Sequence, residues 1–83
     1  MATTQSDIRR WLNEAKKMKA THVIVVCDTF DWEDYPVYVA SNEDVRKKYV
    51  EYNGPNMQRV MEVYSLGMDI ERQLNETWAF HFD

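Results

Sequence analysis

The sequence predicts one α+β domain in which a small three-stranded antiparallel sheet packs with three helices, in the order α-β-β-α-α-β. Two observations carry this prediction. Apolar residues recur every three or four positions over residues 4–19, as in an amphipathic helix. Residues 23–27 are apolar at every position, which is typical of a strand that is covered on both faces. A chain of 83 residues has room for a single domain.

The first helix is expected over residues 4–19. Thr4 and Asp7 have the spacing of a capping box, which satisfies backbone N–H groups at a helix start. The lysines at residues 16–19 lie where the helix dipole favours cations. The apolar stripe of this helix is expected to consist of Ile8, Trp11, Leu12, Ala15 and Met18.

A β-hairpin is expected over residues 22–40. Its first strand runs from His22 to Phe30 and, because it is apolar throughout, should be the central strand of the sheet. The segment DWEDYP forms the connection, and the second strand starts at Pro36, a position where a strand tolerates proline. The two strands should pair in antiparallel orientation.

The second helix is expected over residues 42–53, with Ser41 as its N-cap. The pair Asn53-Gly54 should end it in a left-handed conformation, and Pro55 should then begin a third helix over residues 56–75.

The end of the chain alternates aromatic and other residues in the segment TWAFHF, which predicts a third strand over residues 77–82.

The predicted third helix carries apolar residues over about half of its circumference, more than one sheet would cover. Methionine and tyrosine are favoured at interfaces. A small chain with one cysteine also lacks disulfides as a source of stability. We therefore expect a homodimer that associates through the second stripe of this helix, which consists of Met57, Met61, Tyr64 and Met68.

The hairpin connection is rich in acidic and aromatic residues. One hypothesis is a site for a divalent cation or a nucleotide, with Asp28, Asp31 and Glu33 as candidate metal ligands. The segment lacks the spacing of an EF-hand and contains no glycine, so a solvated turn is the simpler explanation of the acids. Another hypothesis is protein recognition, because exposed aromatics act as anchors at interfaces. The residues expected to contact a partner are Asp31, Trp32, Glu33, Asp34 and Tyr35.

The composition narrows the function class. The formal net charge is −4, so we do not expect nucleic acid to be the partner; the alternative is weak binding of nucleic acid through Lys16 and Lys17 on the first helix. No glycine-rich phosphate loop or catalytic constellation is present, and we expect a non-enzyme without a cofactor. Cys27 lies in the apolar run and should be a buried thiol. The sequence has neither a signal-peptide pattern nor a membrane span, and we expect a cytoplasmic protein.

The prediction that follows is a small interaction protein, an accessory or inhibitor that occupies the surface of a protein partner through its acidic-aromatic hairpin tip. Small, acidic, aromatic-rich chains without catalytic motifs are typical of phages and other mobile elements. By this analogy the partner is a nucleic-acid-handling enzyme of the host, whose basic groove accepts carboxylates in place of phosphates.

Overall fold

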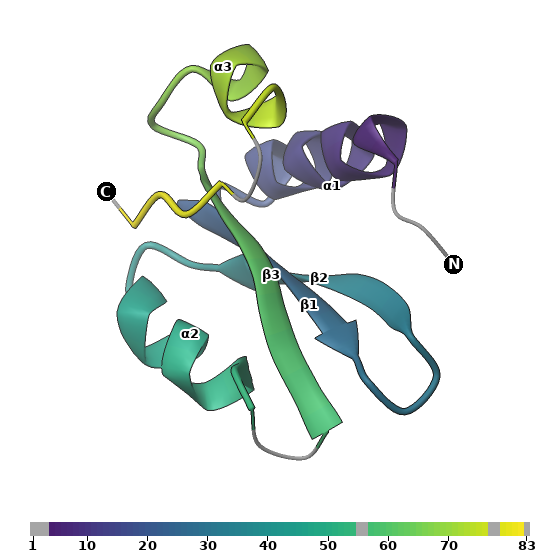
Figure 1. The fold of residues 1–83 in the computed structure, drawn as a ribbon. Coiled ribbons are helices and arrows are strands. Elements are labelled where there is room, and N and C mark those ends of the chain that lie inside the picture. The colour runs from purple at the N-terminus through teal and green to yellow at the C-terminus, as the bar shows by residue number, and fades with distance from the viewer. Residues whose placement is uncertain (1–3, 55–56, 77–78, 83) are drawn as a thin grey trace.

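A computed structural model describes residues 4–54, 57–76 and 79–82 of the chain. Three helices and three strands follow one another as α1 (Gln5–Lys17), β1 (His22–Asp28), β2 (Glu33–Val39), α2 (Val45–Tyr52), β3 (Gln58–Ser65) and α3 (Ile70–Leu74). The strands form one antiparallel sheet in the order β2-β1-β3 (Figure 1). The predicted α+β class, with three helices on a three-stranded antiparallel sheet, is confirmed, and so is the central position of the first strand.

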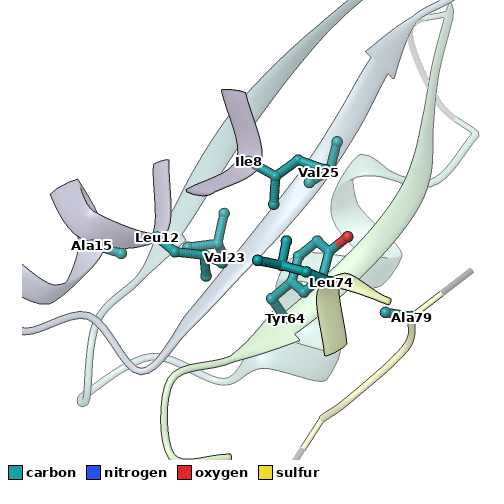
Figure 2. Close-up of a cluster of buried hydrophobic side chains, with 8 residues drawn as sticks. All are labelled: Ile8, Leu12, Ala15, Val23, Val25, Tyr64, Leu74 and Ala79. Carbon is teal, nitrogen blue, oxygen red and sulfur yellow. The ribbon is translucent and has the colours of Figure 1, made fainter. Parts of the chain in front are cut away.

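Strand β1 is buried on both faces. Val23 and Val25 point into one hydrophobic cluster with side chains of α1 and α3, whereas Ile24 and Val26 point into a second cluster with Val45 of α2. Each of these four β1 residues is at most 1% exposed. Figure 2 shows the first cluster, which consists of Ile8, Leu12, Ala15, Val23, Val25, Tyr64, Leu74 and Ala79. The helices therefore divide between the two faces of the sheet, with α1 and α3 on one and α2 on the other.

The first helix agrees with the sequence, and the hairpin forms where it was predicted but with different strand ends. Strand β1 ends at Asp28 and not at Phe30, and β2 begins at Glu33 and not at Pro36, because residues 33–36 continue the pairing with β1. The Thr4 hydroxyl accepts from the Asp7 N–H, the Asp7 carboxylate accepts from the Thr4 N–H, and the predicted capping box is thus confirmed. Strands β1 and β2 pair from His22 with Val39 to Asp28 with Glu33, within the predicted hairpin. The second helix is shorter than predicted. Its N-cap is Asp44 and not Ser41, because the Asp44 carboxylate accepts from the N–H groups of Arg46 and Lys47.

The predicted helix over residues 56–75 is wrong. Residues 58–65 form β3, and α3 covers residues 70–74 alone. The sequence pattern of this segment resembles a helix because β3 contains a β-bulge. Val26 pairs with Val60 and Val25 pairs with Glu62, which leaves Met61 as an extra residue. In a regular strand, residues three apart face opposite sides of the sheet.

The extra residue at the bulge changes this alternation of the side chains between the two faces of the sheet. Val60 and Val63 both face the α2 side, and Tyr64 faces the α1 side. Apolar residues at positions i, i+3 and i+4 are also the pattern of a helix. The bulge thus gives β3 a helical spacing of its buried residues.

The strand predicted over residues 77–82 is not formed in the described residues; residues 79–81 instead make a short contact with Val63 of β3. Ala79 accepts a hydrogen bond of 2.8 Å from the Val63 N–H, and the His81 N–H donates to the Val63 carbonyl at 3.0 Å. Phe80 forms one isolated parallel bridge with Val63. Residues 77 and 78 of the predicted strand lie outside the described residues. In the structure β3 therefore precedes α3, whereas the sequence predicted the third helix before the third strand.

Gln73 connects α3 to the end of β3. Its side chain is 1% exposed and makes three hydrogen bonds. The amide oxygen accepts from the Ser65 N–H at 2.7 Å, and the amide nitrogen donates to the carbonyls of Ser65 and Asp69 at 2.8 and 3.1 Å. A helix of five residues has little stability of its own, so this buried amide holds α3 in place.

We expect Gln73→Leu to lower the free energy of unfolding by about 2–3 kcal/mol, because leucine fills a similar volume but makes none of these buried hydrogen bonds. Urea denaturation measures the change. The control is Arg72→Leu, which alters an exposed neighbour on α3 and should change stability by less than about 0.5 kcal/mol. Equal losses in both variants would show that the Gln73 hydrogen bonds contribute nothing specific.

Candidate functional site

The loop between β1 and β2 extends beyond the helices at one end of the sheet (Figure 1). Its acidic side chains shape it. The Asp28 carboxylate accepts from the Phe30 N–H at 2.8 Å, and the Asp31 carboxylate accepts from the Glu33 N–H at 3.2 Å. The Trp32 N–H donates to the Asp28 carbonyl at 2.7 Å and closes the turn. Aspartate side chains that bond to the backbone two residues on are typical of tight turns.

Two large aromatic side chains stand on this turn in contact with solvent. Phe30 is 77% exposed and Trp32 is 62% exposed. Trp32 also has a φ of 59°, in the left-handed region that bulky residues seldom adopt. This conformation costs about 1–2 kcal/mol in an L-residue other than glycine. The fold therefore holds a bulky aromatic outward at a position where glycine or asparagine would be more stable.

Met57 lies next to this turn. Both the backbone N–H and the hydroxyl of Thr29 donate to the Met57 carbonyl, each at 2.8 Å. Met57 is 55% exposed and has a φ of 61°, again in the left-handed region. We call the resulting surface the tip patch, which consists of Phe30, Asp31, Trp32, Glu33 and Met57.

The predicted recognition residues divide between the tip patch and the sheet. Asp31, Trp32 and Glu33 are exposed on the patch. Asp34 lies opposite Cys27 in the sheet, and Tyr35 packs against the α2-side cluster while its hydroxyl accepts from Gln58. Phe30 was not among the predicted recognition residues, because the first strand was predicted to continue to this residue. The signal available in the sequence was Asp28, whose carboxylate ends the strand by capping the Phe30 N–H.

The predicted self-association residues do not form one surface. Tyr64 is 2% exposed in the core, and Met61 packs against the same cluster. Met57 and Met68 are exposed but flank opposite ends of β3, about 25 Å apart along an eight-residue strand. The homodimer remains a prediction, but the helical stripe on which it was based does not exist in the described residues.

The candidate metal ligands serve the turn. Asp28 and Asp31 each accept a backbone hydrogen bond, as described above, and Glu33 pairs with Asp28 across the hairpin. Among residues 4–54, 57–76 and 79–82, no three His, Cys, Asp or Glu side chains are placed to hold a metal ion.

Cys27 is buried, as predicted. Burial and the neighbouring Asp34 carboxylate raise the pKa of its thiol, so the thiol stays protonated and is a poor nucleophile. The two histidines have separate partners: His22 Nδ1 lies 2.9 Å from the Thr21 hydroxyl, and His81 Nε2 lies 2.8 Å from the Glu76 carboxylate.

The basic residues do not form one surface either. Those of α1 and those of α2 lie on opposite faces of the sheet, because the two helices pack into different clusters. Several of them are paired with acids, namely Arg9 with Glu71, Arg10 with Asp7, Lys17 with Glu14 and Lys48 with Glu43. The fold thus separates the two patches that a nucleic-acid backbone would have to contact together.

Comparisons of the chain with protein-family models, with curated proteins and with solved structures found no match. Within the described residues, no helix combines the length and the apolar character needed to cross a membrane.

Glu62 is a partly buried carboxylate that pairs with Val25 on the α1 side of the sheet. Burial raises its pKa, whereas hydrogen bonds from the Tyr64 hydroxyl and the Ala79 N–H partly oppose this increase. Burial also raises the pKa of Tyr64, which keeps its hydroxyl protonated as the donor. A carboxyl group whose pKa is raised by folding costs stability when it ionises. That cost is absent at a pH below 4.5, the ordinary pKa of a glutamate carboxyl group. It grows as the pH rises through the raised pKa of Glu62 in the folded protein.

We expect Glu62→Gln to raise the Tm at pH 7 and to lose this advantage below about pH 4, because glutamine keeps a hydrogen-bond acceptor but carries no charge. Thermal denaturation at the two pH values measures the difference. The control is Glu51→Gln on the exposed side of α2, which should change the Tm little at either pH. A Tm gain for Glu62→Gln that is the same at both pH values would contradict a cost of ionisation.

Proposed function

We propose that this protein is a non-enzymatic interaction protein that binds the surface of a protein partner through the tip patch, as an accessory or inhibitor. The observation that carries the proposal is the exposure of Phe30 and Trp32 on either side of Asp31, at the end of a paired hairpin. Aromatic side chains that project from a rigid support are the residue type that dominates binding energy at interfaces.

The conformation of the turn supports the same proposal. Trp32 and Met57 both adopt left-handed backbone conformations, and both are exposed. Strained backbone is concentrated at binding and catalytic sites, where the surrounding structure fixes it. The backbone of the turn is held by the hydrogen bonds of Asp28, Asp31 and Thr29. Such preorganisation reduces the entropy lost on binding.

The charge of the region defines the chemistry of the partner. Residues 21–44 contain six acidic residues and no lysine or arginine. A complementary surface has an apolar pocket for the aromatic rings, with arginine or lysine at its rim to pair with Asp31 and Glu33. Enzymes that handle nucleic acids carry basic grooves of this kind, and we propose such an enzyme as the partner class.

We expect the double substitution Phe30→Ser/Trp32→Asn to weaken partner binding by roughly 1,000-fold, since each of the two aromatic anchors contributes about 2 kcal/mol. The Tm should be unchanged or higher, because asparagine tolerates the left-handed conformation of residue 32 better than tryptophan. Affinity capture from cells that contain the protein identifies the partner, and calorimetric titration of the purified pair measures the affinity.

The matched control is Met18→Ser, which removes another exposed apolar side chain, 59% exposed, at the end of α1. This variant should bind as the wild type does. The proposal is wrong if the double variant retains its affinity. It is also wrong if affinity and Tm fall together, because the aromatics would then act in folding and not in recognition.

A further inference from the structure

A second exposed apolar surface lies between α2 and the end of the chain. It is a groove of about 540 Å³ lined by Arg46, Tyr49 and Val50 of α2 and by Phe80 and Phe82 of the terminal segment. Val50 is 68% exposed and Phe80 is 41% exposed. A groove of this size is within the range of pockets that bind ligands. We call it the α2 groove.

The α2 groove combines aromatic rings with one cation. The ring of Tyr49 meets the ring of Phe80 edge-on at 6.2 Å and the ring of Phe82 edge-on at 5.3 Å. The guanidinium of Arg46 stands 4.8 Å above the Phe82 ring. Within residues 4–54, 57–76 and 79–82, no carboxylate forms an ion pair with Arg46. The groove thus offers an aromatic surface beside a guanidinium that can accept a carboxylate from outside.

The occupant that fits this chemistry is present in the same chain. The tip patch presents Phe30 and Trp32 with Asp31 and Glu33 beside them, so its aromatics match the rings of the groove and its acids match Arg46. A tip cannot fill the groove of its own chain. The turn has only four residues between β1 and β2, whereas the groove lies beyond β3 at the other edge of the sheet. Figure 1 shows the β1–β2 loop at the lower right and the yellow terminal segment to the left of β3, toward the opposite edge of the sheet.

We propose that two copies of the chain form a two-fold dimer in which the tip patch of each copy occupies the α2 groove of the other. The inference rests on the proposed function of the tip patch and names a second copy as one of its partners. In this arrangement each contact is made twice, so the assembly closes as a dimer. Together, the aromatic side chains of the two tips and the two groove surfaces would bury on the order of 1,000 Å² of accessible surface area, which is typical of a weak specific interface.

Sedimentation velocity of the full-length protein over about 1 µM to about 1 mM tests the proposal by charge reversal. One variant reverses the groove, Arg46→Glu, and the other reverses the tip, Asp31→Lys/Glu33→Lys. Each variant alone places like charges in both contacts, and its dimer should dissociate at least about tenfold more readily than that of the wild type. An equimolar mixture of the two variants has opposite charges in both contacts, so it should form a heterodimer with nearly the affinity of the wild type.

The control is Lys47→Glu, which reverses the next charge on α2 outside the groove and should leave the dimer intact. A wild type that stays monomeric at the highest concentration overturns the inference, as does a dimer that Arg46→Glu does not weaken. Oligomers larger than a dimer overturn the two-fold arrangement. The proposed function is tested separately, because Arg46→Glu should retain the capture of another partner by the tip, whereas the Phe30→Ser/Trp32→Asn variant should not.

Discussion

The fold depends on the burial of β1 on both of its faces. Val23 to Val26 are apolar at every position, so neither face of this strand can be left in water without losing about 1.5–3 kcal/mol for each exposed side chain. One layer of helices would cover only Val23 and Val25. The chain therefore places α1 and α3 on one side and α2 on the other, and it pairs β1 with a strand at each edge. The place of the tip patch follows from this arrangement, since the β1–β2 turn leads into β2 and Met57 leads into β3, the two strands that flank β1.

The parts of this arrangement that depend on local pattern could be predicted from the sequence. The apolar run of β1 predicts a central strand, and the capping residues Thr4 and Asp7 predict the start of α1; both are confirmed. The strand β3 could not be recognised in the same way. Its bulge at Met61 places Val60 and Val63 on one face, a spacing that a single sequence cannot distinguish from a helix. Tertiary pairing with β1 decides the conformation here.

The candidate site was predictable to the extent that it depends on composition. Acids and aromatics between two strands indicate an exposed turn, and Trp32 lies on it as expected. The hydrogen bond from Phe30 to Asp28 and the proximity of Met57 depend on where β1 ends and where β3 begins, and neither boundary follows from spacing alone. The same difficulty applies to the α2 groove. Its walls come from a helix and from a segment about 30 residues later in the chain, which meet only because the segment lies along β3.

We infer that the indole of Trp32 is held in solvent in the free protein and becomes buried when the tip is bound. Fluorine NMR of protein labelled with 5-fluorotryptophan tests it directly, because the chain has three tryptophans and Trp32→Phe identifies the signal of Trp32. In dilute protein this signal should shift between H₂O and D₂O, as a solvent-exposed fluorine does. The shift should disappear as the tip is occupied. A Trp32 signal that is insensitive to the solvent in dilute protein would show that the indole folds onto the domain, and would contradict its role as an exposed anchor.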